Sequence, residues 1–171
     1  MKVYTRKGDN GEADLMGGIR AHKGDDRFHT LGDLDELNAW MGLAKCVTSE
    51  DERAFIEQIQ GDLGTMMAHI AALGSKALEQ HPFPAGLDTE LEKRIDALSK
   101  DEEIFSFTLP GVNESSACVN AARTIARRAE RSVCTLAWEY PITHDVLKYM
   151  NRLSDYLFVL GVNEAKKGER K

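Results

Sequence analysis

The sequence has few of the residues that mark secreted, zinc-binding or membrane proteins. Its 171 residues include three cysteines, Cys46, Cys118 and Cys134, which are widely spaced and form no C-x-x-C pair. An odd and scattered set of cysteines argues against a disulfide framework and against a zinc site. No apolar run approaches the roughly eighteen residues of a membrane span, and the first residues contain no apolar signal-peptide core. We therefore expect a cytoplasmic protein that does not cross a membrane.

Proline is scarce, and basic residues are fewer than acidic ones. The chain has four prolines, and its 22 lysines and arginines are outnumbered by 28 aspartates and glutamates, so the formal net charge is −6. An acidic chain is a poor general binder of nucleic acid. The glycines gather in the first 32 residues, where Asp9-Asn10-Gly11 is a strong turn signal. We expect a single domain over residues 1–171, with an irregular arm over residues 1–25 and a frayed, charged tail over residues 165–171.

Two classes of enzyme lack their motifs in this chain. The five histidines form no H-E-x-x-H pair and no Glu-x-x-His occurs, so a di-iron bundle enzyme is excluded. The Gly-x-Ser-x-Gly elbow of many hydrolases is also absent. We predict no metal site built from the protein's own side chains.

Apolar residues recur at three- and four-residue steps through most of the chain, which predicts amphipathic helices. The expected helices cover about residues 26–47, a segment from Ser49, about residues 88–99, a segment from near Asn113 and one from near Thr143. Ser49 and Glu52 fit a capping box at the start of the second helix. Long helices joined by short connections favour antiparallel neighbours. The predicted fold is therefore an all-α, five-helix antiparallel bundle.

The densest cationic segment is residues 119–131, which read V-N-A-A-R-T-I-A-R-R-A-E-R. Arg123, Arg127 and Arg131 recur at four-residue steps, so they share one face of the predicted helix and leave the apolar positions on another. On an acidic molecule this row suits a polyanion such as a nucleoside triphosphate. The alternative is a solvated surface with arginine–glutamate pairs, and the segment alone does not decide between the two.

Several other polar segments also have two interpretations. The glycine-rich arm could cradle phosphates with its backbone N–H groups, or it could be a flexible turn. Four basic residues accompany these glycines: Arg6, Lys7, Arg20 and Lys23. The acidic residues of G-D-L-D-E-L-N either complement a helix dipole or pair with the arginines. Asn151, one helical turn before Asp155, is either a structural contact or a ligand contact, and Phe107 taken alone is an ordinary core anchor.

The motifs taken together resemble one protein family. In chain order they are Y-T-R-K-G-D-N-G, R-A-H-K-G-D-D-R, G-D-L-D-E-L-N, F-T-L-P-G, A-R-T-I-A-R-R-A-E-R and L-K-Y-M-N-R-L-S-D-Y-L-F. This order resembles the PduO-type ATP:cob(I)alamin adenosyltransferases over about residues 2–162. The resemblance implies a five-helix bundle that forms a homotrimer with active sites between subunits. It also implies transfer of the 5′-deoxyadenosyl group of ATP to the cobalt of a reduced corrinoid, with release of triphosphate.

The resemblance also implies roles for individual residues. In the arm, ATP would be bound by Thr5, Arg6, Lys7, Gly8, Asp9, Ala13, Asp14 and Lys23. From the helices, ATP would be bound by Arg127, Arg128, Glu130, Arg131 and Asn151. The corrinoid would be bound by Asp35, Phe107, Arg123 and Asp155, with Asp35 and Arg123 forming a salt bridge across the subunit interface. Among these, the expected catalytic set is Phe107, Arg127, Asp35 and Arg123, and Phe107 would take the place of the lower axial cobalt ligand.

The implied small molecules are ATP, Mg²⁺ and cobalamin as a substrate. The implied partners are a reductase that supplies the electron and an adenosylcobalamin-dependent enzyme that accepts the product. Mg²⁺ and the arginines would stabilise the negative charge that accumulates on the leaving triphosphate.

Two departures from the family pattern affect this expectation. Lys7 replaces the usual threonine, and Ala13 and Asp14, preceded by Glu12, stand where hydroxyl side chains are usual. A carboxylate near a phosphate weakens ATP binding unless a cation compensates or the carboxylate points to solvent. Val112 replaces a glycine and cannot easily take positive φ, which predicts a different loop path. These departures keep a second hypothesis open, a non-catalytic trimer of the same fold that binds corrinoid or a nucleotide.

Overall fold

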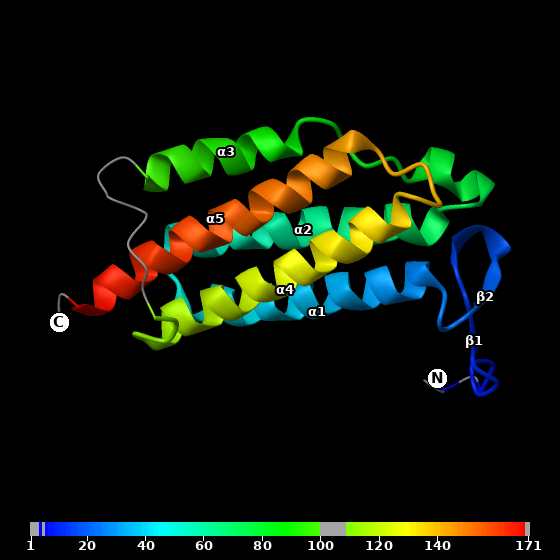
Figure 1. The fold of residues 1–171 in the computed structure, drawn as a ribbon, viewed down its shortest axis with the longest axis horizontal. Helices are drawn as coiled ribbons and strands as arrows, with labels where there is room; N and C mark the ends of the chain where they lie inside the picture. Colours follow the sequence, from blue (N-terminus) through cyan, green and yellow to red (C-terminus); the bar gives the residue numbers. More distant parts are fainter. Residues whose placement is uncertain (1–3, 5, 100–108, 170–171) are drawn as a thin grey trace.

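The computed structural model describes residues 4, 6–99 and 109–169, and helices dominate it (Figure 1). Its five α-helices are α1 (Asp26–Val47), α2 (Glu50–Ala72), α3 (Leu87–Leu98), α4 (Glu114–Leu136) and α5 (His144–Glu169). The shorter elements are β1 (Glu12–Asp14), η1 (Met16–Gly18), β2 (Arg20–His22) and η2 (Lys76–Gln80), where η marks a 3-10 helix. The predicted all-α, five-helix bundle is confirmed. None of the helices in the described ranges is long and apolar enough to cross a membrane.

Each helix reverses the direction of the one before it, but one pair of neighbours is parallel. α4 packs against both α1 and α5, α1 packs against α2, and α3 packs against α5. Along α3 and α5 the contacts advance together, from Asp88–Lys148 to Glu92–Arg152 and then to the Leu98 carbonyl bonded by Asn163. Consecutive helices are antiparallel, as expected, whereas α3 and α5, which are separated in the chain by α4, pack in parallel.

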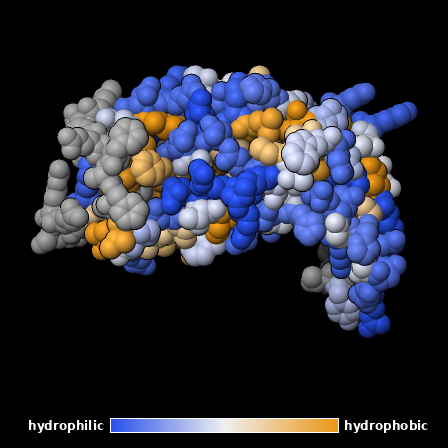
Figure 2. Space-filling view, in the orientation of Figure 1, coloured by the Kyte–Doolittle hydropathy of each residue, from blue (hydrophilic) through white to orange (hydrophobic). Residues whose placement is uncertain are grey.

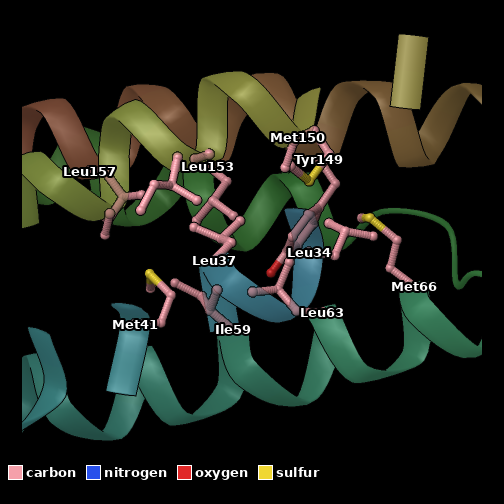
Figure 3. Packing of buried hydrophobic residues seen from close by; sticks show 14 of the residues in the cluster. Leu34, Leu37, Met41, Ile59, Leu63, Met66, Tyr149, Met150, Leu153 and Leu157 are labelled. Atoms are coloured by element: carbon pink, nitrogen blue, oxygen red, sulfur yellow. The ribbon is translucent and has the colours of Figure 1, made fainter. Parts of the chain in front are cut away.

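The core lies between α1, α2, α4 and α5, and Figure 3 shows leucine, isoleucine and methionine side chains that pack together in it. Leu37 of α1, Leu63 of α2 and Leu153 of α5 are fully buried. Burying a side chain of this size stabilises the fold by about 1.5–3 kcal/mol. This packing fixes which face of each helix is left for solvent.

Two buried tyrosines connect α5 to acidic side chains of α2. The Tyr149 hydroxyl donates to Asp62 at 2.9 Å, and the Tyr156 hydroxyl donates to Glu52 at 2.7 Å. Burial raises the pKa of both tyrosine hydroxyls and, against the effect of the Tyr149 hydrogen bond, the pKa of Asp62. Arg94 of α3 completes the group by donating to Glu52 at 2.5 Å. Three helices therefore meet at the Glu52 carboxylate.

The Glu52 contacts correct the expected capping box at Ser49. Ser49 is the N-cap of α2, but its side chain makes no capping hydrogen bond within the described chain. Glu52 is 3% exposed and turns inward to Arg94 and Tyr156 instead of back to the helix start. A capping box does occur at the start of α4, where the side chains of Asn113 and Ser116 bond each other's backbone N–H groups.

The last helix continues into the segment that was expected to fray. α5 continues to Glu169, so most of the tail predicted to fray from residue 165 is helical. Ala165 is buried, and Lys167 pairs with Glu164 at 2.5 Å. Asn113 also donates to the Glu164 carbonyl at 2.7 Å, which ties the start of α4 to the end of α5.

The N-terminal arm contains a small β-hairpin where an irregular segment was expected. β1 and β2 pair antiparallel, with Ala13 opposite Ala21, and they lie beyond the end of the bundle at which α1 begins (Figure 1). The hairpin is anchored through η1: a Cβ added at Gly17 would lie 2.3 Å from the Ser75 hydroxyl, so the arm touches the bundle there. Leu15, just before η1, is buried.

Arg27 joins three parts of the bundle at this same end. Its guanidinium donates through Nε and Nη2 to Asp25 at 2.8 Å and through Nη1 to the Leu73 carbonyl at 3.1 Å. It also lies over the Tyr140 ring, 5.0 Å from its centre. Asp25 is the N-cap of α1, Leu73 ends α2 and Tyr140 precedes α5. The Arg27 hydrogen bonds hold the pKa of Asp25 below its usual range.

The Asp25→Asn variant should lose about 1–3 kcal/mol of unfolding free energy at neutral pH, since it removes the negative charge that accepts two hydrogen bonds from Arg27. The folded-state pKa of Asp25 lies below the ordinary 3.8, so its stabilisation is complete above that pH and is lost as pH falls further. Urea unfolding of the variant and of the unmodified protein from pH 7 to pH 3 measures the difference in unfolding free energy between them. The difference should be constant down to about pH 5 and narrow below it; a difference that grows toward low pH contradicts the assignment.

Candidate functional site

The arginine row of α4 lies on the outside of the bundle. The inner side of α4 is lined by buried small and aliphatic residues, Ala122, Ala126, Ala129 and Val133 among them. Arg127 and Arg131 are exposed, and Arg131 donates to the Arg127 carbonyl at 2.9 Å. Figure 2 shows a band of hydrophilic residues across the middle of this face, with apolar residues on either side of it. The helix therefore presents guanidinium groups to solvent from a rigid, packed backbone.

Arg128, the next residue, is directed differently. Its guanidinium binds Asp33 at 3.0 Å and also binds Glu36, both on α1. Ser132 adds a 2.5 Å hydrogen bond to the other Asp33 oxygen. For Asp33 and Glu36, the interpretation as partners of the arginine helix is the correct one. Arg128 was predicted to bind ATP, and in this chain it links α4 to α1.

Asp35 and Arg123 occupy separate positions in one chain. Asp35 is exposed on α1, whereas Arg123 is half-buried on α4 and donates to Asn120 at 3.3 Å. No ion pair joins them within the described part of a single chain. Since their expected bridge crosses a subunit interface, it stays a prediction.

Arg123 lines a cavity of about 310 Å³ at the start of α4. The other lining residues are Pro110, Gly111, Ala117, Asn120, Ala121 and Thr124. The turn before α4 has its positive φ, 92°, at Gly111, so the backbone turns one residue before Val112 and the expected difficulty at Val112 does not arise. Phe107 and Thr5, both predicted site residues, lie outside the described residues.

Both polar atoms of the Asn151 side-chain amide form hydrogen bonds. Its Nδ2 donates to Glu130 at 3.1 Å, and its Oδ1 accepts from Arg152 at 2.8 Å. Arg152 is in turn bound to Glu92 of α3 at 2.8 Å. The structure therefore brings together two predicted ATP ligands, Asn151 and Glu130. Sequence reasoning missed Arg152, although its place beside Asn151 in N-R-L-S-D was a signal.

Asp155 lies on a different side from Arg123. It pairs with Arg152 at 3.4 Å and lines a hollow of about 460 Å³ between α3 and α5. The remaining lining residues of that hollow are Glu92, Ile95, Asp96 and Arg152. The residues that line the Arg123 cavity are not among them, so the two predicted corrinoid ligands are not brought to one cavity.

The predicted phosphate loop of the arm is closed by backbone hydrogen bonds. Gly11 donates to the Gly8 carbonyl at 3.2 Å, and Lys23 donates through its backbone to Gly11 at 2.8 Å. Arg6 takes φ of 60°, a conformation uncommon for a residue with a side chain. Lys23, predicted to reach phosphates, donates its ammonium to the Gly8 carbonyl at 2.9 Å. The exposed arm residues Lys7 and Asp9 lie in this turn region.

Both carboxylates that depart from the family pattern bind one arginine. Glu12 and Asp14 each lie 2.9 Å from the Arg20 guanidinium on the neighbouring strand. These interactions raise the pKa of Arg20, with the Glu12 hydrogen bond as the largest cause. Arg20 carries one positive charge, so it pairs with both carboxylates and offsets one of their two negative charges. A compensating cation was expected, but Arg20 was not identified as that cation.

The described residues hold no group of three or more His, Cys, Asp or Glu side chains suited to a metal ion.

Several known proteins are similar to this chain in sequence. The sequence model of the family described as Cobalamin adenosyltransferase matches residues 3–164. Corrinoid adenosyltransferase PduO of Salmonella typhimurium is 37% identical over 163 residues, which are 94% of this chain and 48% of that protein. The chain thus spans about half of that relative. Corrinoid adenosyltransferase of Bacillus subtilis is 38% identical over 164 residues, which are 92% of this chain and 83% of that protein.

Solved structures agree with the sequence comparison. A PduO-type ATP:corrinoid adenosyltransferase from Lactobacillus reuteri, with a phenylalanine replaced by alanine and complexed with cobalamin and ATP, matches with a TM-score of 0.87 at 32% identity. The match covers 97% of this chain and 96% of that one. A variant from the same organism with an arginine replaced by lysine, complexed with ATP, matches with a TM-score of 0.84 at 32% identity, over 99% and 96% of the two chains.

The neighbouring residues Arg127 and Arg128 should differ in their effect on stability. Arg128→Ala removes the links to Asp33 and Glu36, and we expect a loss of about 1 kcal/mol in unfolding free energy. Arg127→Ala removes an exposed side chain and should change it by less than about 0.5 kcal/mol. Urea unfolding of the two variants beside the unmodified chain measures both. Equal losses would show that the α1–α4 ion pairs do not distinguish the two arginines.

Proposed function

Because the chain belongs to the cobalamin adenosyltransferase family, we propose that it transfers the 5′-deoxyadenosyl group of ATP to the cobalt of a reduced corrinoid. The observation that carries the proposal is the exposed arginine row of a packed helix beside the Arg123 cavity, in a fold shared with a structure complexed with cobalamin and ATP. Cobalt(I) supplies the electron pair that forms the cobalt–carbon bond. The C5′–oxygen bond breaks, its electrons leave with triphosphate, and cobalt becomes formally trivalent.

The reaction requires the protein to position the two substrates and to supply positive charge. Arg127 and Arg131 are exposed along one face of α4, where they can meet the triphosphate as its charge grows. Asn151, with its amide held by Glu130 and Arg152, is already oriented to bind the nucleoside. No side chain has to act as nucleophile or strong base, so holding the two substrates in line supplies most of the rate.

We propose that the corrinoid binds at the cavity at the start of α4. Its lining is mostly apolar with Arg123 at its edge, which suits a large ring carrying polar substituents. We assign to Phe107 the lower face of the cobalt, where an apolar group favours a four-coordinate ion that is easier to reduce. Mg²⁺ enters with ATP, and phosphate oxygens supply its ligands, as they do in other nucleotide enzymes.

The active enzyme is proposed to be a homotrimer with shared sites. The hairpin lies beyond one end of its own bundle (Figure 1), and η1, between its two strands, contacts α2 and η2. Arg127 is exposed on α4. An arm from a neighbouring subunit would cover this part of α4 and complete the ATP site. We also propose that the enzyme works in the cytoplasm with a reductase that generates cobalt(I) and with an acceptor that uses the adenosylated product.

The first test is anaerobic turnover with MgATP and chemically reduced cob(I)alamin. We expect adenosylcobalamin and triphosphate in equal amounts, and we expect Arg127→Ala to lower turnover on the order of 100-fold, by analogy with the loss of one transition-state donor. Arg53→Ala, which removes an exposed arginine of α2, is the matched control and should retain activity. Corrinoid binding without any product at saturating ATP would instead support the non-catalytic hypothesis.

Subunit mixing tests whether the site is shared. Lys7→Glu in the arm and Arg127→Ala in α4 should each be nearly inactive alone. After exchange of equal amounts, each mixed trimer holds one site with both intact halves, so about a quarter of full activity should return. Sedimentation establishes the trimer. Activity equal to the mean of the two separate variants would place the arm and α4 of one site in the same chain.

A further inference from the structure

The Arg20 guanidinium has four partners on the other strand and on the loop before it. It binds Glu12 through Nε and Asp14 through Nη1, both at 2.9 Å. Its Nη2 donates to the Lys7 carbonyl at 2.5 Å and lies 3.5 Å from the Asn10 amide oxygen. Glu12 and Asp14 are two residues apart on β1, so their side chains share a face of the hairpin with Arg20.

We propose that Arg20 is a positioning residue for ATP, because it pairs with Glu12 and Asp14, offsets one of their two negative charges and fixes the peptide between Lys7 and Gly8. The proposal rests on the proposed function, in which the loop over residues 6–11 binds the triphosphate. Arg20 itself is directed into the hairpin and acts through the loop.

Two cations orient two successive peptides of the loop, and Arg20 acts on the peptide between Lys7 and Gly8. Arg20 holds the Lys7 carbonyl, and Lys23 holds the next carbonyl, that of Gly8, at 2.9 Å. In a planar trans peptide the N–H points opposite to the carbonyl, so the Gly8 N–H is directed away from Arg20. The Asp9 N–H donates to the Arg6 carbonyl at 3.4 Å, so the Gly8 N–H is the donor that Arg20 orients for an anion. A Cβ at Gly8 would lie 3.2 Å from the Lys23 ammonium, so the glycine also permits this approach.

The charge of the arm depends on Arg20 as well. The ionised residues of the described arm from residue 6 to residue 23 are Arg6, Lys7, Arg20 and Lys23 against Asp9, Glu12 and Asp14. Without Arg20 the two β1 carboxylates would stand unpaired near a highly charged anion. Exposed ion pairs contribute little to folding stability, so the effect of Arg20 should appear in nucleotide binding. A planar fork with five donors suits this set of acceptors, and a lysine could not serve them together.

The test compares Arg20→Gln with the triple variant Arg20→Gln, Glu12→Gln, Asp14→Asn in the full-length protein. We expect Arg20→Gln to raise the Kd and KM for MgATP on the order of tenfold to a hundredfold, as unpaired carboxylates near a phosphate should. The kcat at saturating ATP should change by less than about twofold, because the reacting atoms are not contacted. The triple variant should recover most of the lost affinity. Arg53→Gln removes one positive charge from the start of α2 and should leave the Kd unchanged.

Salt separates the electrostatic effect from a purely structural one. The loss in Arg20→Gln should shrink between about 50 mM and 500 mM salt, where screening is stronger. An unchanged Kd in Arg20→Gln overturns the proposal, and so does a triple variant that binds as weakly as Arg20→Gln. Calorimetry measures the Kd without turnover. An unmodified chain that binds MgATP but forms no product would refute the proposed function alone, whereas full turnover with unaffected Arg20→Gln refutes only this inference.

Discussion

The ion pairs between α1 and α4 determine what the arginine helix presents to solvent. Arg128 is bound to Asp33 and Glu36, and Ser132 binds the same Asp33. An α-helix turns about 100° per residue, so directing Arg128 toward α1 directs Arg127 away from it. The alanines on the inner side allow the close packing of α4 that keeps this rotation. One structural arginine therefore sets the orientation of the arginines that are left free for a ligand.

The buried polar groups act in a similar way on the other side of the bundle. Glu52 is reached by Arg94 of α3 and Tyr156 of α5, while Asp62 is reached by Tyr149. Leaving any of these groups unpaired in the core would cost more than its hydrogen bond contributes, so the pairs strongly favour one relative placement of α2, α3 and α5. Arg152, which binds Glu92 on α3, carries that placement to Asn151 at the surface. The candidate nucleotide contact is thus supported by a chain of polar contacts that involves α3 and α5.

The local sequence pattern was enough to predict the helices, but it did not predict which side chains pair between helices. α1 was predicted with the bounds it has, because its apolar repeat is regular and an aspartate stands at its N-cap. Ser49 was assigned a capping box because the pattern does not show that Glu52 has a partner 42 residues away in Arg94. The hairpin was missed since three-residue strands are too short for alternation to be visible. Nothing in the local sequence distinguishes Arg127 from Arg128, because Asp33, the partner of Arg128, is 95 residues away in the chain.

The candidate site joins two halves that are stabilised differently, and this explains where departures from the family pattern are tolerated. The α4 half is part of the core, so a change there must preserve packing on the inner face and ion pairs with α1. The arm half is anchored near η1 and consists mainly of exposed side chains and backbone turns. In the arm, binding of a phosphate would require a suitable net charge and a suitable direction of a few peptide groups. Different side chains can meet both requirements. Glu12 and Asp14 on β1 are both paired with Arg20 on the neighbouring strand. Substitutions near the phosphates should therefore be judged by the charge of the whole hairpin and not by single positions.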